Sequence, residues 1–388
     1  MISIKRPVVL GVVASLALGI FAAVPAAHAD PVSNSYAAVG SDTLQASMNA
    51  LTNGTSVTGP RVRVTASGAT LGNFDAFAPG FNAAGGTIQT KPAGNFFGRP
   101  SGSGAGVDAL VASINNTTYT ANGVTANVGG LIDIARSSAG PSAQVAGGLL
   151  AWVPYGRDAV AFAYSGGSAA DQANVADLTP GQLNTIYSAT ADQVINGTTV
   201  KAYLPQSGSG TRKFFMGAIG IPSNVAGSAV FTNNNTLAEN DATVFPTTVP
   251  VGTAYVVPFS AANWISQSNL AAPNTIPASG AVKLGTPVVD ASNVPVPAYT
   301  GTGTALVPNA PFYANTTFGR DTYLVVEAAR LDSTNAAKYD ATLASLLDPT
   351  RTGSLTNMSS STTSAGGVKR TFGFLTVSST TILYSNTK

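Results

Sequence analysis

Three stretches of the chain place serine, threonine and glycine directly before a segment with helical spacing of apolar residues. They are the first loop (residues 40–43), the second loop (101–106) and the third loop (207–211). The first backbone amides of a helix have no intrahelical acceptor and carry partial positive charge, and glycine lets a ligand approach them closely. One such loop is most simply a helix cap. Three of them, with Arg136 at the end of an apolar run, predict a shared oxyanion site.

The segments around these loops predict α/β architecture. Val107, Leu110 and Ile114 have the spacing of one helix face after the second loop, and similar spacing follows the other two loops. Short apolar runs typical of buried strands lie at 131–135, 159–164 and 254–257. Alternation of the two patterns is typical of an α/β fold rather than a β-sandwich.

Two more helices are expected away from the loops. Thr179 precedes Pro180, and Gln182 follows three residues after Thr179, which is the pattern of a capping box with a first-turn proline. Residues 336–347 have the apolar spacing of a further helix. The stretches rich in Gly, Pro, Asn and Thr, at 71–99 and 269–309, are expected to be loops.

Composition excludes several kinds of chemistry. The 388 residues include 19 Lys and Arg, 17 Asp and Glu, one His and no Cys. Such a balanced charge is not that of a nucleic-acid-binding protein. Without cysteine there is no disulfide, no thiolate metal site and no lipid anchor on an N-terminal Cys.

The N-terminal residues predict export. Lys5 and Arg6 precede an uncharged apolar stretch, and Ala27 and Ala29 supply the small residues of a cleavage site. We therefore expect residues 1–29 to be a signal peptide, and the protein to be soluble outside the cell membrane. Cleavage would remove His28 and with it imidazole chemistry.

Enzyme motifs are not evident. The sequence has neither a G-x-S-x-G nucleophile motif nor a phosphate-binding P-loop, and we expect no catalytic residues, no cofactor and no metal site. Glu239 and Asp241 are most simply carboxylates at a helix start, with ligand contact as the alternative. Two other functions stay open: a secreted carboxylate- or metal-dependent hydrolase of phosphate esters or sugars, and a β-rich carbohydrate-binding surface protein.

Six short segments carry a resemblance to a known family. They are residues 40–44, 102–106, 132–138, 154–160, 178–187 and 207–212. In this order and spacing the chain resembles the phosphate-binding proteins of bacterial phosphate-specific ABC importers, within the type II periplasmic binding protein superfamily. The resemblance implies a monomer that binds inorganic phosphate and delivers it to the importer's membrane permease.

The resemblance also implies the domain organisation. The family fold is a clamshell of two α/β domains, with the ligand in the cleft between them and a hinge that the chain crosses twice. On this chain, domain I would comprise residues 30–155 and 259–388, and domain II residues 156–258.

Site residues follow from the same resemblance. The family positions that bind phosphate match Thr43, Leu44, Ser103, Ser209, Gly210 and Thr211. Residues beside these positions complete the expected site: Ser41, Asp42, Gly104, Arg136, Ser137, Ser138, Ser207 and Arg212.

The chain departs from the family pattern at two positions. Pro205 stands where the family has a phosphate-binding arginine, and Ser138 stands where it has an aspartate that accepts the phosphate proton. Arg212 or Arg136 could supply the guanidinium. Asp42 could accept the proton, and a carboxylate there would reject sulfate, which has no proton to donate.

Overall fold

The computed structural model describes residues 36–78, 85–221 and 234–388. In these residues the largest sheet is mixed and has 11 strands. Its main path follows the order β11-β10-β12-β8-β16-β7-β1-β2. These strands are β1 (Tyr36–Gly40), β2 (Leu71–Asn73), β7 (Ile134–Ser137), β8 (Leu150–Gly166), β10 (Thr198–Pro205), β11 (Asn234–Leu237), β12 (Thr253–Ser260) and β16 (Gly319–Glu327). The predicted signal peptide lies outside the described residues.

Shorter strands extend the sheet or form hairpins. β9 (Gln193–Ile195), β13 (Val282–Leu284) and β17 (Leu383–Ser385) join the main sheet, and the remaining strands are β3 (Thr87–Ile88), β4 (Phe97–Gly98), β5 (Thr118–Ala121), β6 (Val124–Asn127), β14 (Tyr299–Thr300) and β15 (Val307–Pro308). The two stretches expected to be loops contain strands of two or three residues.

Helices cover the sheet and confirm the predicted α/β class. They are α1 (Gln45–Asn53), α2 (Ser103–Ile114), α3 (Ala169–Val175), α4 (Pro180–Ser188), α5 (Gly210–Ala218), α7 (Ala261–Ser268), α8 (Ala310–Ala314), α9 (Ala341–Leu346) and α10 (Ala365–Thr371). Two 3-10 turns lie at Ala242–Val244 and Ala328–Arg330. Helices α1, α2 and α5 begin at the three loops, as predicted, which disfavours the chiefly β alternative. Within the described ranges, none of the helices is both long and apolar enough to span a bilayer.

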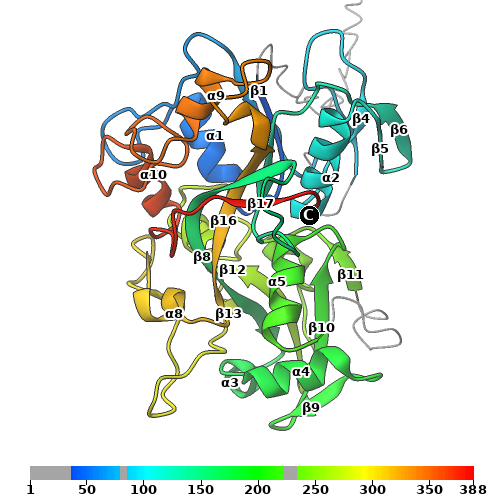
Figure 1. Ribbon diagram of the computed structural model, residues 1–388. Coiled ribbons are helices and arrows are strands. Elements are labelled where there is room, and N and C mark those ends of the chain that lie inside the picture. The colour runs from blue at the N-terminus through cyan, green and yellow to red at the C-terminus, as the bar shows by residue number, and fades with distance from the viewer. Residues whose placement is uncertain (1–35, 79–84, 222–233) are drawn as a thin grey trace, which may run out of the picture.

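Buried apolar residues divide these elements into two lobes. Lobe I packs β1, β2, β7, α1 and α2 around cores that include Leu44 and Val107. Lobe II packs β10, β11, β12, α3, α4 and α5 around a core that includes Phe162 and Phe215. Figure 1 shows lobe I above lobe II, with β8 and β16 running between them. The 17-residue β8 pairs with β16 along its first part and with β12 along its last part, so it joins the lobes.

The region after the expected return crossing at residue 259 contacts both lobes. Phe312, Tyr313 and Phe318 pack into the core of lobe II, whereas Ala262, Ala271 and Ala272 pack with a core of lobe I. Buried apolar residues therefore join this region to both lobes before β16 begins at Gly319.

The sequence predicted a helix start correctly where the hydrogen-bonding residues are close together in the chain. The capping box is confirmed: Thr179 Oγ1 accepts from Gln182 N at 3.2 Å, and Thr179 N donates to Gln182 Oε1 at 2.9 Å. The helix predicted over 336–347 is shorter, because Asp340 caps α9 by accepting from Leu343 N at 2.9 Å. The strand predicted over 131–135 begins only at Ile134.

Candidate anion-binding site

The first and third loops follow the carboxyl ends of β1 and β10, and the second loop lies beside the first. β1 is parallel to β2 and β7, and Gly40 forms a parallel bridge with Ser101. Gly40 has φ +107°, and a Cβ there would lie 2.7 Å from the Arg136 carbonyl oxygen. Glycine is therefore required where the first loop leaves the sheet.

Four buried hydroxyl groups meet where the lobes touch. Thr43 Oγ1 lies 3.4 Å from Thr211 Oγ1, and Ser103 Oγ lies 3.1 Å from Ser138 Oγ. Each of these residues is at most 4% exposed. A Cβ on Gly210 would lie 2.2 Å from Ser103 Oγ and 2.5 Å from Ser138 Oγ, so the backbone of the third loop abuts both serines. We call Thr43, Ser103, Ser138, Gly210 and Thr211 the hydroxyl cluster.

Backbone amides at the start of α5 add donors to the hydroxyl cluster. Ser209 is the N-cap, and its Oγ accepts from Arg212 N at 2.9 Å. The amides of Gly210 and Thr211 precede the first intrahelical bond, which Lys213 N donates to Ser209 O at 3.1 Å. The positive end of the α5 dipole therefore lies at the hydroxyl cluster.

Direct hydrogen bonds hold the lobes together around the cluster. Gly104 N donates to Gly208 O at 3.0 Å, and Gln206 Nε2 donates to Ser101 O at 2.8 Å. Asn240 Nδ2 donates to Thr43 Oγ1 at 3.3 Å. These bonds join loops of opposite lobes, so the two lobes are in direct contact around the hydroxyl cluster.

Arg320, the second residue of β16, brings a guanidinium to the hydroxyl cluster. Its Nη2 donates to Thr211 Oγ1 at 3.0 Å. Its Nε and Nη2 bond the Asp158 carboxylate at 3.1 and 2.8 Å, within an ion pair whose side chains are 2% and 0% exposed. The other terminal nitrogen, Nη1, is buried and has no hydrogen-bond partner among the described residues. A buried donor without an acceptor beside a group of hydroxyls is an arrangement that an anion would satisfy.

The two arginines expected at the site have other contacts. Arg136 is fully buried behind the first loop, and its three nitrogens donate to the carbonyls of Ser41, Ala38, Gly40 and Phe74 and to Asn73 Oδ1. Burial lowers its pKa to about 10. Arg212 Nη1 donates to Pro205 O at 2.9 Å. Arg136 therefore shapes the first loop from within lobe I, and Arg320 is the guanidinium whose bond to the cluster the structure records.

A pair of carboxyl groups borders the cluster. Asp42, in the first loop, lies beside Glu239, which follows β11 in lobe II. Asn240 Nδ2 bridges Asp42, at 3.2 Å, and Thr43. Glu239 is 2% exposed, and its two carboxylate oxygens have no hydrogen-bond partner among the described residues. Burial, and then the charge of Glu239, raise the pKa of Asp42 well above its usual range.

Most of the other expected residues shape the loops. Ser41 Oγ accepts from Thr43 N at 3.3 Å, and Ser137 Oγ donates to Ala139 O at 2.6 Å. Leu44 is fully buried in a core of lobe I. Ser207 is exposed and lines a cavity beside the cluster.

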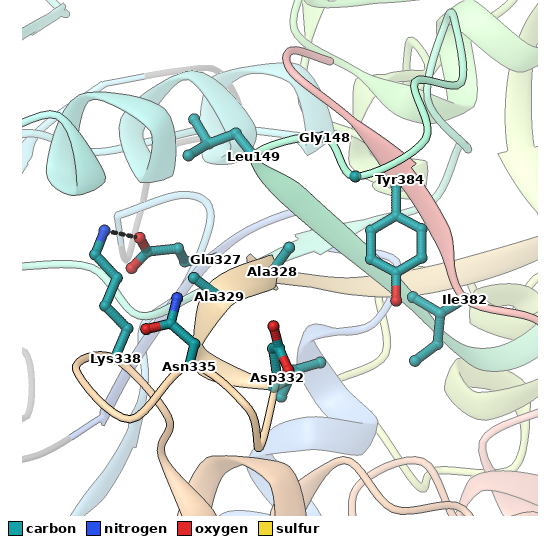
Figure 2. A pocket seen from close by; sticks show the side chains of 12 residues that line it. Gly148, Leu149, Glu327, Ala328, Ala329, Asp332, Asn335, Lys338, Ile382 and Tyr384 are labelled. Atoms are coloured by element: carbon teal, nitrogen blue, oxygen red, sulfur yellow. Dashed lines mark hydrogen bonds and ion pairs between the residues drawn. The ribbon is translucent and has the colours of Figure 1, made fainter.

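A larger cavity, of about 610 Å³, lies at the far end of β16 from the cluster. Glu327 is seven residues from Arg320, or about 23 Å along the strand. Figure 2 shows Lys338 ion-paired with Glu327 at one side of this cavity, and Tyr384 at the other. Because the lysine charge is already neutralised, this cavity offers less to an anion than the hydroxyl cluster does.

Comparison with known proteins found similar solved structures but no similar sequence. No protein-family model and no curated protein matches the sequence. A phosphate ABC transporter substrate-binding protein with bound phosphate from Clostridium perfringens is 12% identical, with 89% of this chain and 100% of that chain covered and a TM-score of 0.47. An ABC-type phosphate transport receptor from Vibrio cholerae is 15% identical, with coverages of 88% and 99% and a TM-score of 0.46. PstS from Borrelia burgdorferi is 11% identical, with coverages of 89% and 100% and a TM-score of 0.40.

Proposed function

We propose that this protein is an exported solute-binding protein that captures inorganic phosphate at the hydroxyl cluster. The observation that supports this most strongly is the convergence of four buried hydroxyls, from both lobes, with Arg320, whose Nη2 bonds Thr211 and whose buried Nη1 has no hydrogen-bond partner among the described residues. Hydroxyls, amides and a guanidinium are the donors that bind tetrahedral oxyanions. Because Asp158 neutralises Arg320, the ligand is held chiefly by dipoles and hydrogen bonds.

The carboxyl pair gives the site a means to select phosphate. Monohydrogen phosphate carries a proton that it can donate to a carboxylate oxygen, whereas sulfate carries none. With one of its two groups protonated, the pair of Asp42 and Glu239 still bears one negative charge. Sulfate would therefore meet that charge without a hydrogen bond in return, and Asp42 with Glu239 would disfavour it.

Binding without turnover fits the groups at the site. The only histidine in the sequence is His28, so no hydroxyl of the cluster has an imidazole base. Closure of the two lobes around the anion excludes water and strengthens each hydrogen bond. We further propose that the signal peptide directs export, and that the closed, loaded form of the monomer delivers phosphate to an ABC importer permease.

The test is calorimetric titration of the mature chain, freed of bound anions by unfolding and refolding. We expect saturable binding of one phosphate per chain, with much weaker binding of sulfate. Incubation with p-nitrophenyl phosphate should release no nitrophenol. Absence of phosphate binding would overturn the proposal, and ester turnover would favour the hydrolase alternative.

A further inference from the structure

Asn240 is a residue of lobe II whose side chain reaches the first loop of lobe I. It follows the end of β11 and is 5% exposed. Its Nδ2 donates to the two carboxylate oxygens of Asp42, at 3.2 and 3.3 Å, and to Thr43 Oγ1 at 3.3 Å. One side-chain amide therefore contacts both the carboxyl group and one of the hydroxyls of the proposed phosphate site.

Two hydrogen bonds hold Asn240 in place. Its Oδ1 accepts from Ser260 N at 2.8 Å, and Ser260 is the N-cap of α7. Its main-chain oxygen accepts from Gln267 Nε2, also at 2.8 Å. Because a backbone N–H occupies Oδ1, the NH₂ group of the amide faces Asp42 and Thr43, where it can act only as a donor.

Donation from Asn240 also determines what the Thr43 hydroxyl can do. Thr43 Oγ1 accepts from Asn240, and Thr211 Oγ1 accepts from Arg320 Nη2 at 3.0 Å. The two hydroxyls carry two hydrogens, and their mutual contact at 3.4 Å uses one of them. No hydrogen bond between described residues uses the other. Since both ends of the Thr43–Thr211 pair receive a hydrogen bond, the pair has one O–H group to donate to an anion.

The same amide favours the charged form of Asp42. Burial, and then the charge of Glu239, raise the pKa of Asp42, whereas the hydrogen bond from Asn240 lowers it. Without the amide, Asp42 would be protonated more readily. A protonated Asp42 would offer the P–OH group of phosphate no charged acceptor, and it would no longer repel sulfate.

We propose that Asn240 is a positioning residue that sets the selectivity of the anion site: its side-chain amide holds Asp42 as a hydrogen-bond acceptor and the Thr43–Thr211 pair as a donor. This arrangement matches monohydrogen phosphate, which has one P–OH group and three unprotonated oxygens, whereas sulfate has no proton to donate. The inference rests on the proposed function and assigns part of its selectivity to a residue outside the site expected from the sequence.

The experiment measures the ratio of phosphate affinity to sulfate affinity by calorimetry on the full mature chain. Asn240 has φ +54°, a conformation that glycine adopts without strain, so Asn240→Gly removes the amide and retains the backbone. We expect this variant to lower the ratio about tenfold, the scale of one lost hydrogen bond to a charged group. Asn240→Ala should lower the ratio to the same extent, and circular dichroism checks that each variant is folded.

Two comparisons distinguish this role from a general loss of stability. Asn263 is 7% exposed, and its Nδ2 donates to the main-chain oxygen of Thr43 at 3.0 Å. Asn263→Ala therefore removes another buried amide that bonds the first loop, and it should leave the ratio unchanged. Asn240→Gly combined with Asp42→Asn should lower the ratio no further than Asp42→Asn alone, because both changes act on the same carboxyl group.

The outcomes separate the two proposals. If the unmodified chain prefers phosphate and Asn240→Gly keeps the ratio within twofold, the role of Asn240 is refuted and the phosphate function stands. The same conclusion follows if Asn263→Ala lowers the ratio equally, if Asn240→Gly lowers it further in the Asp42→Asn chain, or if the unmodified chain binds both anions equally. Absence of phosphate binding to the unmodified chain would refute the phosphate function, and this inference with it.

Discussion

Gly210→Ala tests the hydroxyl cluster most directly, because the substitution adds one methyl group at its centre. That Cβ would lie 2.2 Å from Ser103 Oγ, 2.5 Å from Ser138 Oγ and 3.0 Å from Ser103 Cβ. Nonbonded atoms of this kind prefer about 3.5 Å, so the loops must separate by roughly 1 Å. The lobes can no longer close fully, and one or two hydrogen bonds to the anion are lost.

The expected loss of phosphate affinity follows from those hydrogen bonds. A hydrogen bond to a charged group contributes about 1.5–3 kcal/mol, so losing one weakens binding roughly 10- to 150-fold. Neither lobe core is touched. Because the clash lies at the contact between the lobes, the melting temperature of the anion-free variant should fall, and circular dichroism should show that both lobes still fold.

Gly217→Ala is the matched control. Gly217 lies in the same helix, and a Cβ there would meet no atom within 4 Å. This variant should gain roughly 0.5–1 kcal/mol of helix stabilisation and bind phosphate as the unmodified chain does. Calorimetric titration and thermal denaturation of both variants provide the measurements. If Gly210→Ala binds phosphate within twofold of the unmodified chain, the hydroxyl cluster is not the anion site.

Three further substitutions probe the groups around the anion. Ser103→Ala and Thr211→Ala should each weaken phosphate binding by roughly 1–3 kcal/mol in calorimetry, and unchanged affinity in both would contradict the assignment. Arg320→Gln should lower the free energy of unfolding by about 3–5 kcal/mol, because it leaves Asp158 buried and unpaired. Combining it with Asp158→Asn should restore stability, measured by urea unfolding, while phosphate affinity stays low. A double variant that binds normally would exclude the guanidinium from the site. Closure brings Asp42 against a second carboxyl group and raises its pKa, so closure takes up a proton above the ordinary pKa of Asp42. Affinity relative to Asp42→Asn should therefore decrease as pH rises from about 4 toward the raised pKa, and Asp42→Asn should bind sulfate better. Parallel pH profiles, or unchanged sulfate discrimination, would refute this role.

The sequence was informative where a helix start carries its own signal. The three loops and the capping box at Thr179 depend on contacts within a few residues, and the structure places helices after each of them. The hydrogen bonds that cap a helix start join residues a few positions apart, so a short sequence pattern is sufficient to predict them.

Long-range contacts explain what the sequence did not reveal. Arg320 is 109 residues from Thr211 and 162 from Asp158, and no local pattern marks it as a site residue. For Glu239 the sequence contained a partial signal, since contact with a ligand was open as an alternative to a helix start, but its position beside Asp42 was not predicted. The late start of the helix predicted over 336–347 has the same origin, because Tyr36, 304 residues away, bonds Asp340, the residue that caps the start of α9.

The position of Arg320 links anion binding to closure of the lobes. Arg320 lies on β16 and Asp158 on β8, the two strands that run between the lobes, and Asp158 also accepts from Ser260 Oγ and Ala262 N. If the lobes close without an anion, the buried Nη1 has no acceptor among the described residues, at a cost of about 1–3 kcal/mol, and the charge of Glu239 beside Asp42 adds to that cost. In an open form, water could reach these groups. On the proposed function, an anion bound beside Thr43 and Thr211 would satisfy Nη1 in the closed form. The ligand would then stabilise that form by the interactions that it otherwise lacks, which is the differential affinity that a binding-driven closure requires.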